Sequence, residues 1–450
     1  MASTKIRRRR FVAGAVGSTA ALSTALVAAP FVRGAHAAGT LSIGFWDHWV
    51  PNANDATDRL VREWAEKEKV EVKIDFITSQ GNKLLLTGAA ESQAKAGHDI
   101  LALSTWLPAR YKDQLVSMND VMEPLIATNG AVNATVEYLG KIDGKWIGVP
   151  ATVGSQIKGP CSRIDYMKDL AGIDVQAMYP AGAPPKADAW TFDVFLKAAE
   201  ACYKGGHPFG IGLGSTGDSV DTIGAIFHGF GAILVDAKGQ IVVKNDAVRQ
   251  ALDFYKKLMA FLPPDVPAWD DASNNKYLIS GQSSMIMNPP SAWSVAKRDA
   301  PKVAEQLWTH GFAQGPKGRF APFVPYFWSI WDFSKNIPAA KSLIAHLSTA
   351  SSTEKMVIAS GGYDLPSFEK LTTFKVWEEE GPPKGTLYHY PNPYKHQVLS
   401  VAAAPAPHAI AERIYTQATQ TQMAVRYFRG EPLEKTLAWA EGELEGFMRN

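Results

Sequence analysis

Hydrophobic and polar residues alternate with the periods of strands and helices from residue 40 onwards. Residues 41–46 form a short apolar run, and residues 55–69 repeat apolar positions at helical spacing. Every second residue between 70 and 77 is apolar, which would place these side chains on one face of a strand. A helix over 82–96 and a strand over 98–103 are expected next. Strands and helices in this order predict a parallel sheet with right-handed crossovers.

Turn-forming residues divide the rest of the chain. Asp143-Gly144, between apolar residues, predicts a tight turn, and the Pro- and Gly-rich residues 160–185 predict an irregular segment. Asp55 is expected to cap the helix that follows the first strand. We expect strands at 146–150, 209–213 and 283–287, a hairpin that turns at Asp236, helices at 191–203, 219–230, 246–261 and 337–348, and a mainly helical tail at 406–448.

The first 37 residues contain the parts of a cleavable export signal in the required order. Arg8-Arg9-Arg10-Phe11 precedes a stretch rich in Ala, Val and Leu, and Ala35-His36-Ala37 supplies small residues for cleavage. The arginines are typical of the twin-arginine type. Pro30 and many Gly, Ser and Thr residues make the stretch too weakly apolar for a membrane helix. We therefore expect cleavage after Ala37 and a mature protein in the periplasm.

The charge of the chain changes when this leader is set aside. The whole sequence has a formal charge of +2, but the leader holds six of its 46 basic residues and none of its 44 acidic ones. The mature chain therefore has 40 basic and 44 acidic residues, a charge of −4. Such a chain has no excess of basic residues with which to bind nucleic acid. Its length of about 413 residues exceeds what one core usually supports, so two lobes are expected.

Two cysteines, Cys161 and Cys202, occur in the sequence. In an oxidising compartment they can form a disulfide, and two buried thiols are the other interpretation. The sequence leaves both interpretations open. Their spacing does not match a zinc or iron–sulfur motif, so we expect no metal site and no cofactor.

Short motifs lie in a characteristic order along the mature chain. They are Phe45-Trp46, DGKWIGVP at 143–150, WTFD at 190–193, GFGA at 229–232, SGQSSM at 280–285, SKNIPAAK at 334–341 and GGY at 361–363. Together they span nearly the whole mature chain. In this respect the chain resembles the extracellular solute-binding proteins, family 1, of sugar-type ABC importers.

The resemblance implies an α/β chain with the two-lobed periplasmic-binding-protein type II fold, which has a hinge and an interlobe cleft. The N-terminal lobe would comprise residues 38–152 and 313–361. The C-terminal lobe would comprise residues 153–312 and 362–450, with the helical tail. The implied function is that of a monomeric, non-enzymatic protein that captures a carbohydrate or polyol in the cleft. It would deliver this solute to the membrane permease of an ABC transporter.

Aromatic and polar residues at predicted strand ends and in loops are candidates for ligand contact. Flat rings pack against the apolar face of a sugar while nearby polar groups bond to its hydroxyls. Ligands of open parallel sheets bind at the carboxyl ends of strands, and the resemblance implies that several of these loops face the cleft. The candidate ligand-binding residues are Trp46, Asp47, His48, Trp49, Gln80, Trp106, Asn288, Trp293, Tyr326, Trp328 and Tyr363.

One motif favours a different class of protein. Residues 212–217 match GxGxxG, and Asp236 follows at nearly the spacing of a dinucleotide-binding site. An exported NAD(P)-dependent oxidoreductase is therefore one alternative, and a glycoside hydrolase is another. Asp236 lies in a predicted hairpin turn, however, and the glycines also suit a tightly turning loop at the cleft. The adjacent acids Asp270-Asp271 fit an exposed surface better than a hydrolase site. We expect a binding protein and no enzyme.

Overall fold

A six-stranded sheet forms the centre of the structure. The computed structural model describes residues 39–180, 183–379 and 398–449, and the predicted leader lies outside them. The strands of the sheet are β1 (Thr40–Trp46), β2 (Glu71–Ile77), β3 (Ile100–Ser104), β6 (Val149–Ile157), β10 (Phe320–Ile330) and β11 (Val398–Ser400). Their order is β11-β10-β3-β1-β2, and β6 also pairs with β10. β1 is parallel to both β2 and β3, as the sequence predicts, and β10 is antiparallel to β3.

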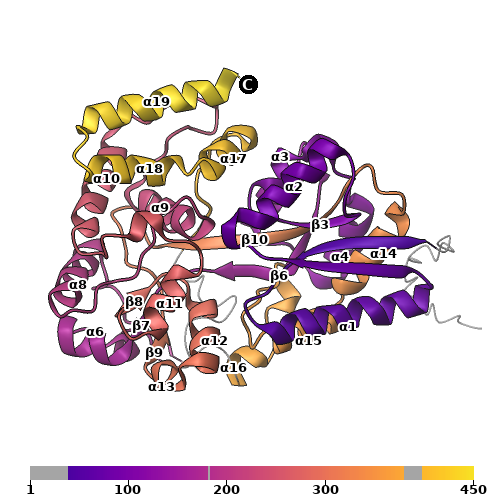
Figure 1. The fold of residues 1–450 in the computed structure, drawn as a ribbon, viewed down its shortest axis with the longest axis horizontal. Helices are drawn as coiled ribbons and strands as arrows, with labels where there is room; N and C mark the ends of the chain where they lie inside the picture. The colour runs from indigo at the N-terminus through magenta and orange to yellow at the C-terminus, as the bar shows by residue number, and fades with distance from the viewer. Residues whose placement is uncertain (1–38, 181–182, 380–397, 450) are drawn as a thin grey trace, which may run out of the picture. The chain divides into compact units, whose positions relative to one another are not determined.

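Helices cover this sheet and form one of two large hydrophobic cores with it (Figure 1). α1 (Pro51–Glu68) packs against α14 (Ile337–Leu347) and α15 (Ala350–Ala359). The prediction that Asp55 caps the first helix is wrong. Pro51 starts that helix four residues earlier, because its fixed φ suits the first helical position and no amide hydrogen is lost there.

The first part of the chain also contains a tight turn between two short strands. Asp143 and Gly144 both have positive φ, 51° and 78°, which confirms the predicted tight turn. The other elements in this part of the chain are η1 (Gln80–Asn82), α2 (Lys83–Ala94), α3 (Leu107–Arg110), η2 (Lys112–Gln114), α4 (Asn119–Asn129), α5 (Ala134–Gly140), β4 (Lys141–Ile142) and β5 (Lys145–Trp146).

The second large core is mainly helical and includes the tail of the chain. Its principal helices are α8 (Phe192–Lys204), α9 (Gly217–Phe230), α10 (Asp246–Met259), α17 (His408–Thr416), α18 (Thr419–Phe428) and α19 (Leu433–Arg449), close to the predicted ranges. The other elements are β7 (Cys161–Arg163), α6 (Ile164–Ala171), α7 (Val175–Met178), η3 (Val266–Ala268), α11 (Ser273–Ile279), β8 (Met285–Ile286), α12 (Pro289–Asp299), α13 (Pro301–Ala304), β9 (Leu307–Thr309), η4 (Glu369–Leu371) and α16 (Val376–Glu379).

The strand pair β6–β10 joins the two cores. Val153 of β6 packs in the sheet core and Ile157 in the helical core. In β10, Tyr326 packs in the sheet core and Phe323 in the helical core. The antiparallel register shifts between Val324 and Tyr326, and such a bulge bends a strand pair locally. These two strands therefore connect the two halves of the described chain at a bend.

One predicted strand and one predicted hairpin are largely absent. The residues at 209–213 make a single bridge, from Gly210 to Ile286, instead of a strand. The predicted hairpin around Asp236 likewise has one bridge, between Val235 and Ile241. Glycine-rich sequence explains the first case, because glycine weakens strand pairing and allows close approach of other segments. No helix in the described ranges combines the length and the apolar character that a membrane span requires.

His98, at the edge of the sheet, is expected to make stability depend on pH. Its ring contacts the carboxylates of Glu91 and Asp75, and these acids raise its pKa although burial opposes the charged form. Because the pKa is higher in the folded state, the stabilisation is complete below about pH 6.5 and disappears as the pH rises through the folded pKa. We expect His98→Gln to cost about 1–2 kcal/mol more at pH 5.5 than at pH 9 in urea unfolding. An equal cost at both pH values would contradict this.

The two cysteines are buried free thiols in different hydrophobic clusters, Cys161 in the small one formed with β8 and Cys202 in the helical core. Burial raises the pKa of both thiols, so little reactive thiolate forms. We expect a thiol reagent to find no reactive thiol in the native protein within minutes and two after denaturation. A denatured protein without reactive thiols would instead show a disulfide.

Candidate functional site

A cavity of about 120 Å³ lies where the two cores meet, beside β6 and β10. This volume is well above the roughly 10–15 Å³ that a cavity needs to hold a single water molecule, so there is room for a small ligand. Its aromatic lining consists of Trp46, Trp49, Tyr326 and Tyr415, and its polar lining includes Gln156, Lys158, Ser215, Thr216, Asp218, Asp271 and Asn288. The lining thus combines flat rings with many polar groups, which suits a polar small molecule.

The aromatic side of the cavity comes from β1 and β10. Trp46 ends β1, and its ring centroid lies 5.5 Å from that of Tyr326 in the middle of β10. The indole Nε1 of Trp46 is buried and has no hydrogen-bond partner among the described residues. Gly154 in β6 has a φ of +90°, and a Cβ there would lie 2.8 Å from the Tyr326 ring. Glycine at this position lets the two rings pack close to the strand.

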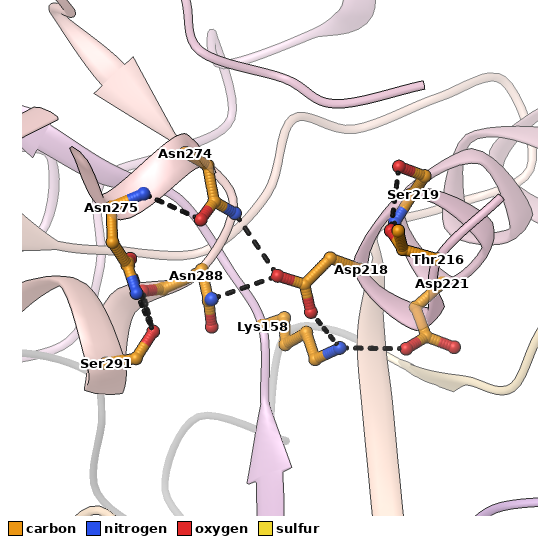
Figure 2. Close-up of polar contacts among 9 residues, drawn as sticks. All are labelled: Lys158, Thr216, Asp218, Ser219, Asp221, Asn274, Asn275, Asn288 and Ser291. Atoms are coloured by element: carbon orange, nitrogen blue, oxygen red, sulfur yellow. Dashed lines mark hydrogen bonds and ion pairs between the residues drawn. The ribbon is translucent and has the colours of Figure 1, made fainter. Parts of the chain in front are cut away.

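Lys158 is the centre of a buried ionic network (Figure 2). It follows β6, and its Nζ lies 2.5 Å from Asp218 Oδ1 and 3.0 Å from Asp221 Oδ2. Burial alone would lower the pKa of Lys158, but the two carboxylates raise it well above its ordinary value, so the ammonium stays charged. Asp221 is fully buried, and its pKa is raised to about 6 by that burial, with Lys158 opposing the shift. Lys158 is therefore held in place by carboxylates of α9.

Asp218 connects this network to two asparagines. Its Oδ2 accepts hydrogen bonds from Nδ2 of Asn288, at 3.1 Å, and of Asn274, at 3.3 Å. Thr216 caps α9 by accepting from the amide of Ser219, and Asp218 lies in the first helical turn, where a negative charge suits the helix dipole. Figure 2 shows the three polar groups of Asp218, Asn274 and Asn288 converging. Both carboxylate oxygens of Asp218 are thus satisfied by protein groups.

Asp271 also lines the cavity, but only one of its oxygens is satisfied. Its carboxylate accepts hydrogen bonds from the Thr216 hydroxyl and the Asp218 amide, while Oδ1 is buried and has no partner among the described residues. Burial, and then the nearby charge of Asp218, raises the pKa of Asp271 to about 7. The expectation that Asp270-Asp271 is a surface pair is half wrong. Asp270 is exposed, whereas the turn after Trp269 directs Asp271 to the cavity.

Four of the eleven candidate ligand-binding residues line the cavity: Trp46, Trp49, Asn288 and Tyr326. The structure gives other surroundings to several of the rest. Asp47 is exposed and accepts a hydrogen bond from Asn54.

The other six candidates are also absent from the lining. Gln80 is exposed at the start of η1. His48 is buried and contacts Asp364, and Tyr363 packs in the sheet core with Trp328. Trp106 is 1 % exposed and donates to the carbonyl of Ala402, and Trp293 lies on α12 under the ammonium of Lys297.

Several cavity residues have no pattern in the sequence that marks them as site residues. Lys158 and Gln156 lie at the end of an apolar strand, where nothing in the sequence sets them apart from surface residues. Asp218 and Asp271 are close in space but 53 positions apart in sequence, and Tyr415 comes from the helical tail. One available signal was the run at 212–217, since Ser215, Thr216 and Gly217 do line the cavity.

The structure does not support a dinucleotide site at 212–217. Asp236 is engaged in its own turn, where Oδ1 accepts from the amides of Lys238 and Gln240, and is not at the end of a parallel strand. Gly214 is required by packing instead, because a Cβ there would lie 2.2 Å from the carbonyl oxygen of Trp269. The described residues also contain no group of three or more His, Cys, Asp or Glu side chains placed to hold a metal ion.

An ionised Asp271 in the cavity is expected to lower the free energy of unfolding. Its pKa is about 7 in the folded state and about 3.8 when unperturbed, so folding stability falls as the pH rises between these values. We expect Asp271→Asn to stabilise the protein by about 1–4 kcal/mol at pH 8 and by less than half as much at pH 4.5, in urea unfolding. Asp265→Asn, on the exposed surface six positions earlier, should give no such gain. Destabilisation by Asp271→Asn at pH 8 would show that the charged form is needed for folding.

Comparison with solved structures shows which fold this is. The maltose-bound MalE3 of T. maritima matches with a TM-score of 0.72 and 16% identity, covering 91% of this chain and 99% of that one. A solute-binding protein of Thermotoga lettingae TMO bound with α-D-tagatose matches with a TM-score of 0.71, 16% identity and 91% and 100% coverage. A sugar transporter from Arthrobacter chlorophenolicus A6 with bound laminaribiose matches with a TM-score of 0.70 and 14% identity, covering 91% of this chain and 99% of that one. The chain therefore has the mixed α/β fold of periplasmic binding proteins.

Sequence comparison identifies the family. Among curated proteins no relative matches this chain. The family model described as bacterial extracellular solute-binding protein matches residues 60–381, which is more than half of the sequence. This family consists of solute-binding proteins and not of enzymes, as the sequence predicts. The chain belongs to the bacterial extracellular solute-binding proteins.

Proposed function

We propose that this protein binds a carbohydrate or polyol in the cavity beside β6 and β10 and delivers it to the permease of an ABC transporter. The observation that carries the proposal is the cavity itself, in which the rings of Trp46, Trp49 and Tyr326 lie beside buried polar atoms without partners. A sugar has an apolar face for such rings and hydroxyls for such atoms. The sugars named for the three similar structures support the same class of ligand.

The proposed ligand contacts are four of the residues predicted from sequence together with polar lining residues. Trp49 is half-buried and Trp46 is almost fully buried, so the two indoles differ in how freely a ligand can reach them. Gln156, Asp271 and Asn288 supply acceptor atoms. Of the remaining candidates, His48 is proposed to position the site, because it contacts the same Asp364 oxygen that accepts a hydrogen bond from the amide of Gly154 in β6.

Ligand binding is proposed to favour a closed arrangement of two lobes, with the boundaries expected from the sequence. The bent pair β6–β10 would act as the hinge. Contacts between residues assigned to different lobes support a closed state: Arg110 pairs with Glu412 at 3.1 Å, and Trp106 donates to Ala402 at 2.8 Å. A ligand shifts such an equilibrium only through contacts that exist in the closed state, and a cavity lined from both sides provides them.

Export to the periplasm through the twin-arginine leader, with cleavage after Ala37, belongs to the same proposal. The family is an extracellular one, which supports a location outside the cytoplasm. Sequencing the N-terminus of the exported protein tests the cleavage site directly. A mature chain that begins at Ala38 is expected, and a retained leader would overturn this part of the proposal.

Ligand binding is tested by a thermal-shift screen over sugars, polyols and oligosaccharides, followed by titration calorimetry with the best ligand. We expect Trp49→Ala to weaken binding about ten-fold or more, because it removes a ring from the cavity. The matched control is Trp439→Ala, which removes a half-buried indole from α19, outside the cavity. Trp293→Ala should change affinity less than two-fold, since Trp293 is not in the lining.

The results separate three possibilities. Loss of affinity in Trp49→Ala alone supports this cavity as the site. Loss in Trp293→Ala but not in Trp49→Ala would place the ligand elsewhere, near α12. Absence of binding by any carbohydrate or polyol would overturn the proposed class of solute.

A further inference from the structure

The charges at the cavity are not balanced within the protein. Three carboxylates, those of Asp218, Asp221 and Asp271, surround the single ammonium of Lys158. Lys158 is the one basic side chain among the described residues that line the cavity. Its ammonium contacts Asp218 and Asp221, whereas the groups that hydrogen-bond to Asp271 are the hydroxyl of Thr216 and the amide of Asp218. Where Asp271 is ionised, at about pH 7 and above, the cavity therefore carries an excess of negative charge, which is costly without a further cation.

The buried acceptor atoms of the lining point to the same conclusion. Asn288 is 3 % exposed, and its Nδ2 must face Asp218, because a carboxylate can only accept hydrogen bonds. That contact fixes the orientation of the amide and leaves Oδ1 as a buried acceptor without a partner. Asp271 Oδ1 is a second such acceptor, and both residues line the same cavity and interact with Asp218. These two acceptor atoms of the lining therefore have no donor of their own among the described residues.

We propose that the ligand carries a protonated amine beside its hydroxyl groups, and that Asp271 and Asn288 receive the amine. The inference rests on the proposed function and narrows its ligand to amino sugars or amino polyols. A protonated amine supplies up to three donors and the missing positive charge in one group, whereas a hydroxyl supplies one donor and no charge. The indole faces of Trp46 and Trp49 also attract cations, which favours the same ligand. Asp271 is the specificity-determining residue in this arrangement.

Other ways of balancing the charge fit the structure less well. A metal ion would need further anionic or imidazole ligands, and the described residues contain no such group of three. A second basic side chain is not among the described lining residues. Protonation of Asp271 removes its charge and turns one acceptor into a donor, but with a pKa of about 7 this form makes up only about half of the protein at pH 7. The amine satisfies both the charge and the acceptors at once.

The test uses matched pairs of probes in titration calorimetry at about pH 7. The pairs are D-glucosamine with D-glucose, D-galactosamine with D-galactose, and D-mannosamine with D-mannose, and each N-acetyl derivative serves as a neutral control of similar size. We expect at least one amine to bind about ten-fold or more tightly than both its parent sugar and its N-acetyl derivative. Equal or tighter binding of the neutral sugar, or of some other neutral carbohydrate when no amine binds, would overturn the inference.

Variants assign the preference to Asp271. Asp271→Asn keeps the size of the side chain and one acceptor oxygen but removes its charge, so the preference for the amine over the neutral sugar should fall about ten-fold towards unity. Asp265→Asn, the same change on the exposed surface, should keep the full preference, and circular dichroism checks that both variants fold. An unchanged preference in Asp271→Asn would overturn the role of this residue. Tight binding of a neutral sugar leaves the proposed function standing, whereas failure of every carbohydrate removes both.

Discussion

The antiparallel pairing of β6 with β10 is the contact on which the rest of the structure depends. Each strand sends side chains into both large hydrophobic cores, so neither core is complete without the pair. The cavity lies beside the same two strands, which supply Gln156, Val324 and Tyr326 to its lining, with Lys158 directly after β6. Both hydrophobic cores and the cavity therefore depend on the same pair of strands. A change in the register of this pair would move the cavity lining and both cores together.

Local periodicity predicted the elements that depend on local interactions. The first β–α–β units, the turn at Asp143-Gly144 and the helical tail all occur close to their expected positions. The eleven-residue β10 was not predicted, because Pro322 and Pro325 interrupt its sequence and proline is rare in central strands. In the structure Pro325 lies within the bulge, where no regular ladder bond is needed.

The candidate site shows the same division between local and distant interactions. Trp46 follows from its place at the end of the first strand, which is a local property. Asp271 does not, since its neighbour Asp270 has the same side chain and is exposed, and only the path of the chain distinguishes the two. Trp106 and Trp328 look like ligand platforms in the sequence but complete cores in the fold, because a large indole stabilises a core as well as it binds a sugar. Four of the eleven residues predicted from the sequence therefore line the cavity, and the others depend on long-range packing that local patterns do not reveal.

The position of the helical tail determines when the cavity can form during synthesis of the chain. Tyr415 and Thr416 of α17 line the cavity together with residues from β1, more than 360 positions earlier in the chain. A ribosome must therefore have synthesised almost the entire chain before this cavity can close, and a nascent or truncated chain has no complete pocket. The proposed recognition of a solute therefore requires α17 to be in place, because this helix forms one wall of the cavity.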